Sequence, residues 1–256
     1  MSAVLSARGI SVSFGGVQAL IDADIEVAPG QLVGLIGPNG AGKTTFIDAI
    51  SGFVPCRGSV HLDGVDITSL PAHRRARLGM ARTWQAIELF DDLTVHENLT
   101  VAAHHLPPTT SFKELFGRAF RDTGVVDEAL AEFQIGHLAD ATPTELTQGQ
   151  RKLVAVARAL AAKPKLLCLD EPAAGLDASE SVEFGRHLRG IVDRGTPALL
   201  IDHDMGLVLG ISDQVVVLEF GRVIATGTPA SVRSNRDVVT AYLGDGAKDL
   251  EGAGDH

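Results

Sequence analysis

Cysteine, positive charge and long apolar runs are all scarce in this sequence of 256 residues. Its two cysteines, Cys56 and Cys168, are too few for a disulfide framework, which is in keeping with a reducing compartment. No apolar stretch approaches the roughly 20 residues that a membrane-spanning helix needs, so we expect no segment that crosses a bilayer. The first eight residues also lack the basic start, apolar centre and cleavage site of a signal peptide. Together these absences predict a cytoplasmic location.

The charge balance narrows the class of protein further. Lys and Arg number 22 against 32 Asp and Glu, and the formal net charge of -10 argues against a protein that grips nucleic-acid backbone. We interpret the basic residues at positions 73–77 as a solvated helix face. No internal repeat is evident, which indicates one unit rather than two in tandem. With 45% hydrophobic residues, the chain can bury the core of a large α/β domain.

Hydrophobic spacing predicts the start of a parallel α/β core in the first part of the chain. Residues 4–27 alternate between apolar and polar side chains, as in a sheet that flanks such a core. A continuous apolar run at 32–36 predicts a buried strand, and a glycine-rich loop and a helix at 43–50 follow it. A hairpin with a tight Asp-Gly turn is expected at 60–67.

The spacing becomes helical from residue 90 to residue 145, and we predict a helical insertion there. Two prolines, Pro107 and Pro108, interrupt it. The polar, glycine-rich end at 245–256 is expected to be a flexible tail. After the insertion the α/β alternation resumes, with helices predicted at 150–162 and 179–193 and strands at 165–169, 198–201 and 214–218.

The loop after the first buried strand has the composition of a phosphate-binding site. Gly37-Pro-Asn-Gly-Ala-Gly-Lys-Thr44 fits the pattern G-x-x-x-x-G-K-[ST]. Its glycines allow successive backbone N–H groups to surround a phosphate, and the positive end of the following helix adds to the attraction. Lys43 is expected to reach the β- and γ-phosphates of ATP, and the Thr44 hydroxyl to hold Mg²⁺. The predicted nucleotide-binding residues of the loop are Gly37, Pro38, Asn39, Gly40, Ala41, Gly42, Lys43, Thr44 and Thr45.

Two adjacent carboxylates follow the apolar run at 166–169. Asp170 and Glu171 are predicted at the C-terminal end of a strand, where open α/β sheets bind ligands. Asp170 suits Mg²⁺, directly or through water, and Glu171 can polarise the attacking water. An isolated Asp-Glu pair is more often a solvated turn, but downstream of a phosphate loop it predicts a site of ATP hydrolysis.

Further motifs, in the same order along the chain, give residues 5–244 a resemblance to ABC-type ATPases. Gln85, in Arg-Thr-Trp-Gln-Ala, matches the Q-loop glutamine of that family, and His203 matches its switch histidine. Asp177, in Ala-Gly-Leu-Asp, matches the D-loop. The signature motif of the family is matched by Leu146, Thr147, Gln148, Gly149 and Gln150.

This resemblance implies a fold and an internal division of the chain. Residues 1–89 and 146–244 would form a P-loop NTPase (RecA-like) core with a flanking antiparallel β-subdomain. Residues 90–145 would form an inserted α-helical subdomain with the signature motif at its end. The expected fold class is therefore α/β, in a single ABC ATPase domain.

The resemblance also implies roles for individual side chains. Gln85 would bind Mg²⁺ and link it and the attacking water to the membrane-facing helical subdomain. Catalysis would depend on Lys43, Glu171 and His203 together with Gln85. Phe14 stands where the family usually has an aromatic residue that stacks on adenine. A Phe on a strand is commonly part of the core, but stacking is the favoured interpretation here, so Phe14 is included among the nucleotide-binding residues.

The signature motif departs from the common form of the family at one position. Thr147 keeps a hydroxyl for the γ-phosphate and Gly149 keeps a bare backbone, but Gln148 replaces a glycine. In ABC ATPases this motif acts on the nucleotide held by the opposite subunit. The resemblance thus implies that two subunits enclose two ATP molecules, with one trans contact altered by Gln148.

The sequences of several stretches resemble those of the branched-chain or hydrophobic amino-acid uptake group of ABC transporters. These stretches lie at residues 14–20, 82–99, 203–205 and 241–244. Membership would imply a second ATPase subunit, with a different chain favoured over a second copy. It would also imply two permease subunits and an external substrate-binding protein, no nucleic acid, and a peripheral position on the cytoplasmic face of the cell membrane.

Other functions stay open from the sequence alone. Urea-uptake and lipopolysaccharide-export ATPases share many of the same sequence motifs. A soluble ABC protein of translation or DNA repair would usually have two such domains or a long coiled-coil insertion, and this sequence has neither. A module that holds ATP without turnover is opposed by the presence of Lys43, Asp170, Glu171 and His203.

Overall fold

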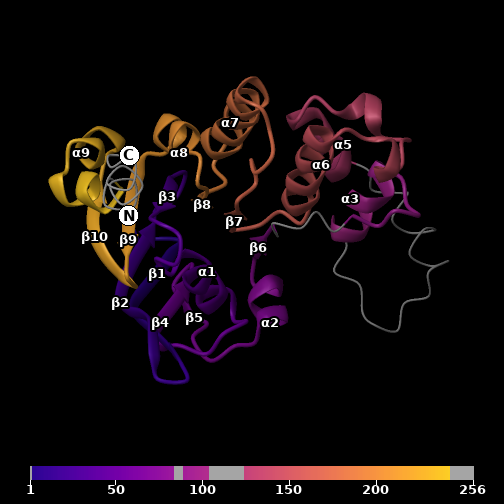
Figure 1. Ribbon diagram of the computed structural model, residues 1–256. Coiled ribbons are helices and arrows are strands. Elements are labelled where there is room, and N and C mark those ends of the chain that lie inside the picture. The colour runs from indigo at the N-terminus through magenta and orange to yellow at the C-terminus, as the bar shows by residue number, and fades with distance from the viewer. Residues whose placement is uncertain (1, 84–88, 104–123, 243–256) are drawn as a thin grey trace, which may run out of the picture.

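The computed structural model describes residues 2–83, 89–103 and 124–242, and it arranges them around two sheets (Figure 1). The larger sheet has six strands in the order β10-β9-β3-β8-β7-β6, parallel except for the β9–β10 pair. The smaller sheet has four antiparallel strands in the order β2-β1-β4-β5. The predicted α/β fold class, with a flanking antiparallel sheet, is confirmed.

The central strands of the large sheet are covered on both faces. Every residue of β3 (Leu32–Ile36), β7 (Leu166–Asp170) and β8 (Ala198–Ile201) is buried. Such strands read as continuous apolar runs rather than alternating ones, which is why their positions were predictable within a residue. The sheet is completed by β6 (Met80–Arg82), β9 (Gln214–Glu219) and β10 (Arg222–Gly227).

Two hydrophobic clusters occupy the two faces of this sheet. One cluster joins alternate strand residues, such as Leu32 and Leu200, to α6 (Gln148–Ala161), α7 (Ala178–Asp193) and α8 (Met205–Ile211). The other joins the intervening strand residues to the small sheet and α1, whose bounds are Lys43–Ser51. The core therefore lies in layers on either side of the large sheet.

The small sheet follows the predicted alternation. It consists of β1 (Leu5–Phe14), β2 (Val17–Val27), β4 (Arg57–Leu62) and β5 (Val65–Asp66). The predicted hairpin turn is confirmed, with Asp63 at φ 50 and Gly64 at φ 76. Positive φ at both central residues is the requirement of a type I′ turn, which matches the twist of the flanking strands.

The described part of the predicted insertion is helical. It contains α3 (Val95–Ala103) and α5 (Gly124–Glu132), which both contact α6 (Figure 1), and short 3₁₀ turns at Gly136–Leu138 and Pro143–Glu145. Pro107 and Pro108 lie outside the described residues, as do Gln85 and the tail at 245–256. The boundaries of the insertion at 90 and 145 stay predictions.

The basic segment at 73–77 forms α2 (Ala72–Arg77), but one of its side chains is not solvated as predicted. Arg75 is 3% exposed. Its guanidinium donates to the backbone oxygens of Ala49 and Ile50, at 2.9 and 2.6 Å, and also to those of Thr68 and Leu70. The last carbonyl groups of a helix lack partners within that helix. Those near the end of α1 accept hydrogen bonds from Arg75, which keeps its guanidinium buried. The expectation of a solvated face is wrong for Arg75 and holds for His73, Arg74 and Arg77, which are exposed.

The short helix α9 (Pro229–Arg233) packs against β9 and β10. None of the helices in the described ranges is long and apolar enough to cross a membrane.

Candidate active site

The phosphate loop connects β3 to α1, and glycine is required at two of its positions. A Cβ atom at Gly37 would lie 2.1 Å from the backbone oxygen of Leu218. Gly42 has φ 105, and a Cβ there would lie 2.7 Å from the oxygen of Ala19. The loop is therefore pressed against β9 and β2. Gly42 caps α1 without a side-chain hydrogen bond, so the N–H groups that open this helix are not blocked by a side chain.

Lys43 bends back over the loop. Its Nζ donates to the backbone oxygens of Gly37 and Pro38, at 2.7 and 3.0 Å. Burial lowers the pKa of Lys43, and the carboxylates of Glu171 and Asp170 oppose that shift. The amino group thus lies above the loop, in the electrostatic range of both predicted carboxylates.

Asp170 and Glu171 end β7 as predicted. Asp170 is 7% exposed, and its Oδ2 accepts a hydrogen bond from Arg82 at 2.9 Å. Glu171 has the left-handed φ of 47, which is uncommon for a residue other than glycine and points to a constrained position. Its N–H donates to the oxygen of Ile201, so it stays tied to the neighbouring strand β8.

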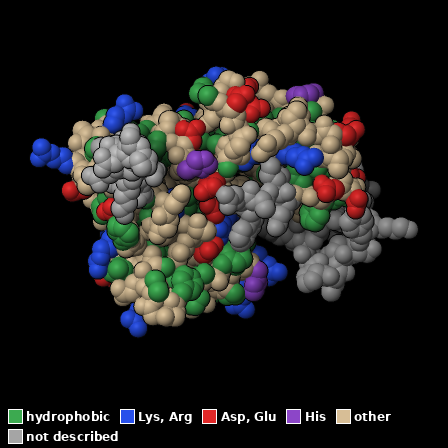
Figure 2. Space-filling model, in the orientation of Figure 1, with side chains coloured by type: hydrophobic (Ala, Val, Ile, Leu, Met, Phe, Trp, Pro, Cys, Tyr) green, Lys and Arg blue, Asp and Glu red, His purple; other side chains and the backbone are tan. Residues whose placement is uncertain are grey.

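His203 follows β8 and lies beside Glu171. Its Nδ1 is 3.8 Å from Glu171 Oε2 and 3.5 Å from Asp202 Oδ1. The structure therefore brings together the phosphate loop, the carboxylate pair and the histidine, because β3, β7 and β8 are parallel neighbours that end at the same edge. Figure 2 shows acidic and histidine side chains adjacent near the middle of one face of the molecule.

Asp202 and Lys152 are among the charged residues near this edge that the sequence reasoning missed. Asp202 is 1% exposed and accepts hydrogen bonds from the backbone N–H groups of Ala173 and Asp204. Lys152 of α6 is 5% exposed, and burial lowers its pKa against the attraction of Asp202 and Glu171. The position of Asp202 directly after a buried strand was an available signal. Lys152 carried none, because its surroundings come from distant segments.

Phe14 does not belong to the core. It ends β1 opposite Val17 and is 51% exposed, so its ring is accessible to a ligand. The strand β2 that pairs with it touches the phosphate loop through Ala19. Thr44 is exposed and Thr45 half-buried at the start of α1.

The segment 146–150 forms the start of α6. Thr147 is the N-cap, and its Oγ1 accepts from the N–H of Gln150 at 3.2 Å, while Gln150 Oε1 accepts from the N–H of Thr147 at 2.9 Å. Because of this reciprocal capping box, the helix begins at Gln148, two residues before the predicted start at residue 150. Leu146 is buried beneath it, and Thr147 and Gln148 are exposed.

Gln148 lies against the segment that contains Asp177. A Cβ on Gly175, which has φ 80, would be 2.6 Å from Gln148 Nε2. Asp177 caps α7 by accepting from the N–H groups of Ser179 and Glu180, and these hydrogen bonds lower the pKa of its carboxyl. The motifs at 146–150 and 174–177 are therefore neighbours within one chain.

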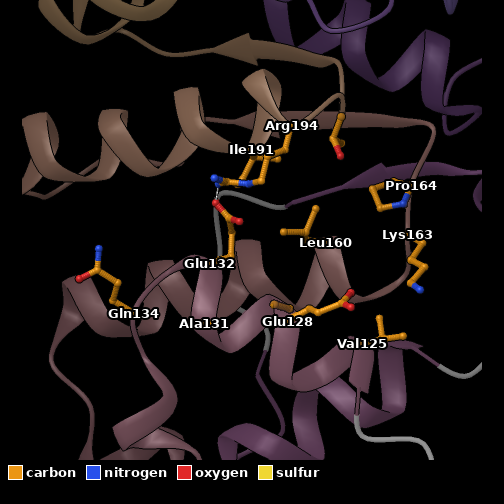
Figure 3. Close-up of a pocket in the computed structure, with 12 residues that line it drawn as sticks. Val125, Glu128, Ala131, Glu132, Gln134, Leu160, Lys163, Pro164, Ile191 and Arg194 are labelled. Atoms are coloured by element: carbon orange, nitrogen blue, oxygen red, sulfur yellow. Dashed lines mark ion pairs between the residues drawn. The ribbon is translucent and has the colours of Figure 1, made fainter.

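A cavity of about 740 Å³ lies apart from this site (Figure 3). It is lined by α5 and by the C-terminal ends of α6 and α7, and none of the predicted site residues that the structure describes lines it. Glu132 of α5 and Arg194 after α7 form an ion pair at its edge (Figure 3). The cavity thus lies between the helical segment and the core.

Comparison with protein families gives two matches. The model of the ABC transporter family matches residues 20–174. The model of the branched-chain amino acid ATP-binding cassette transporter matches residues 222–248.

Individual proteins give a similar result. The high-affinity branched-chain amino acid transport ATP-binding protein BraF of Pseudomonas aeruginosa is 39% identical over 94% of this chain and 98% of its own length. The lipopolysaccharide export system ATP-binding protein LptB of Escherichia coli is 35% identical over 95% and 98%. The crystal structure of the ADP conformation of MJ1267, an ATP-binding cassette of an ABC transporter, superposes with a TM-score of 0.82 at 31% identity, and covers 95% of this chain and 100% of that one.

Proposed function

The chain belongs to the ABC transporter family, and we propose that it hydrolyses ATP to power the uptake of branched-chain or other hydrophobic amino acids. The observation that carries this proposal is the meeting of the phosphate loop, Asp170, Glu171 and His203 at one edge of the sheet. The match of residues 222–248 to the branched-chain amino acid model supports the choice of solute class.

In the proposed mechanism, the chain contributes mainly position and charge. The loop N–H groups and Lys43 bind the phosphates, and Phe14 stacks on the adenine. Glu171 orients and polarises the attacking water, and His203 beside it contacts the transferred phosphoryl group. Gln85 is proposed to couple the water to the helical segment.

The donor set near the loop suits Mg²⁺. Within the described ranges, no group of three or more His, Cys, Asp or Glu side chains is placed to hold a metal ion by itself. Mg²⁺ is usually bound by one or two protein oxygens together with substrate phosphates. The Thr44 hydroxyl and the Asp170 carboxylate would hold it with ATP, and Gln85 is proposed as a further ligand. When bound, Mg²⁺ would neutralise charge on the phosphates.

We propose that the site is completed by a second ATPase subunit. The exposed start of α6 would present Thr147, Gln148, Gly149 and Gln150 to the nucleotide of the partner, with Asp177 nearby. A different chain is favoured as the partner, and a second copy is the alternative. The same complex would contain two permeases and an external binding protein, which places this chain at the cytoplasmic face of the membrane.

A lipopolysaccharide-export role is the second candidate, and the 35% identity to LptB favours it. Purification of the complex from native membranes separates the two functions. Co-purification of permeases together with a binding protein for amino acids supports uptake. Recovery of lipopolysaccharide-export components would overturn it.

The direct test of the mechanism is ATP turnover by the assembled subunits, with wild type compared to Glu171→Gln. Loss of a residue that activates water is expected to reduce turnover by about a hundredfold or more. The variant should still bind ATP and should accumulate an ATP-bound dimer, measured by light scattering. A Glu171→Gln protein that turns over ATP at the wild-type rate would contradict the assignment.

A further inference from the structure

Arg82 forms a buried bridge between two carboxylates at the edge of the active site. It is the last residue of β6, and its side chain is 6% exposed. Nη1 lies 2.6 Å from Asp48 Oδ1, and Nη2 lies 2.9 Å from Asp170 Oδ2. The guanidinium carbon also lies 5.6 Å from the centroid of the Phe53 ring. One side chain thus connects β6, β7 and α1.

The chemistry of this bridge requires arginine. The two contacts use different nitrogens of one planar guanidinium, which a lysine with a single ammonium cannot reproduce. Asp170 is 7% exposed, and a buried carboxylate is tolerated when it is paired and hydrogen-bonded. Arg82 supplies both the positive charge and the directed bond.

The bridge leaves part of Asp170 available. The hydrogen bonds of the described residues engage only Oδ2 of this carboxylate. Asp48 belongs to α1, the helix that follows the phosphate loop, so Arg82 fixes the end of β7 relative to the loop. Arg82 also precedes Gln85 by three positions.

We propose that Arg82 is a positioning residue that holds the Asp170 carboxylate by one oxygen and leaves the other for the Mg²⁺ of bound ATP. This inference rests on the proposed nucleotide site. Side chains that hold a metal ligand in place commonly set the metal affinity, and their loss costs about 10–100-fold. Without Arg82, Asp170 loses its partner and its fixed orientation, so Mg²⁺ should bind more weakly.

The test is a titration of Mg²⁺ against a fluorescent ATP analogue bound to the purified chain. Arg82→Gln is expected to raise the Mg²⁺ concentration at half-saturation about tenfold. Binding of the analogue in EDTA should change less than about twofold, because the loop and Lys43 are untouched. Arg82→Lys keeps the positive charge but not the two separate guanidinium nitrogens, so its Mg²⁺ half-saturation should fall between those of wild type and Arg82→Gln. Asp48→Asn leaves the contact between Arg82 and Asp170 in place, so its Mg²⁺ half-saturation should stay within about threefold of wild type.

Circular dichroism and urea unfolding establish that each variant is folded at the assay temperature, and Arg82→Lys takes the place of Arg82→Gln if the latter is not. An unchanged or lowered Mg²⁺ half-saturation overturns the inference. Equal weakening with and without Mg²⁺ also overturns it, because Arg82 would then support only the fold. If the wild type binds the analogue without any dependence on Mg²⁺, the proposed Mg-ATP site fails as well.

Discussion

Thr147 offers a way to separate the folding role of the signature segment from its proposed role in hydrolysis. Its hydroxyl accepts the N–H of Gln150 as the N-cap of α6, and the side chain is exposed. Thr147→Ala removes this acceptor and should cost about 1 kcal/mol of unfolding free energy. Thr147→Asp keeps an acceptor, and a negative charge at a helix N-terminus is favourable by about 0.3–1 kcal/mol. Its stability should therefore match or exceed that of the wild type.

Hydrolysis should respond in the opposite way. A carboxylate about 4 Å from the γ-phosphate of the partner subunit would repel it by about 4 kcal/mol at an effective dielectric constant of 20. That is roughly a thousandfold loss of ATP-bound dimer. Thr147→Ser keeps both the cap and the hydroxyl and serves as the control.

Urea unfolding measures the first effect, and phosphate release by the assembled subunits measures the second. If Thr147→Asp is stable and inactive, the hydroxyl position faces the nucleotide of the partner. A stable Thr147→Asp protein with wild-type turnover would refute the reasoning, because the segment could not then lie against a phosphate.

Three further changes test the fold. Arg75→Met removes the buried donor to the backbone oxygens of Ala49, Ile50, Thr68 and Leu70, and should lower the unfolding free energy by about 3–5 kcal/mol in urea; a loss below about 1 kcal/mol would contradict the buried role. Gly42→Ala forces a Cβ to 2.7 Å from the Ala19 oxygen at φ 105, so it should cost about 1–3 kcal/mol of stability and most of the nucleotide affinity in a fluorescence titration; wild-type affinity would show that the loop adapts. His187 of α7 lies beside the Phe133 ring, and burial lowers its pKa below the ordinary 6.5. The unfolded chain therefore binds the proton more readily, and the free energy of unfolding falls as pH falls below about 6.5. In urea unfolding, His187→Gln should therefore lose less unfolding free energy than the wild type between about pH 7 and pH 5. Equal losses in the two proteins would show that the pKa of His187 is not lowered in the folded state.

The central strands of the large sheet were predictable because a strand buried on both faces is a continuous run of apolar residues in the sequence. The run at 32–36 and the run at 198–201 coincide with β3 and β8. The phosphate loop was predictable for a related reason, since the spacing of its glycines is a local requirement of close backbone contact. Thr147 shows the limit of periodicity, because the cap that starts α6 lies outside the apolar repeat.

Residues whose partners lie far along the chain left no such record. Arg75 looked like one member of a basic helix, and only the carbonyl groups of α1 make it a buried residue. Arg82 lies 88 positions from Asp170, and Asp202 lies 29 positions from Ala173. Charge and spacing within a short window cannot distinguish such side chains from solvated ones.

Arg82 and Asp202 lie at neighbouring parts of the edge where the proposed catalytic residues meet, and their charges are opposite. Arg82 pairs with Asp170, where positive charge from Mg²⁺ is proposed to arrive. Asp202 lies 3.5 Å from His203 and holds the backbone of Ala173, two residues after Glu171. A buried side chain is held more rigidly by charged hydrogen bonds than by apolar packing alone, because such bonds are directional. Asp170 is thus held from β6, and the backbone just after Glu171 is held from the end of β8, so the segment that carries both carboxylates is tied on two sides while Glu171 keeps a positive φ.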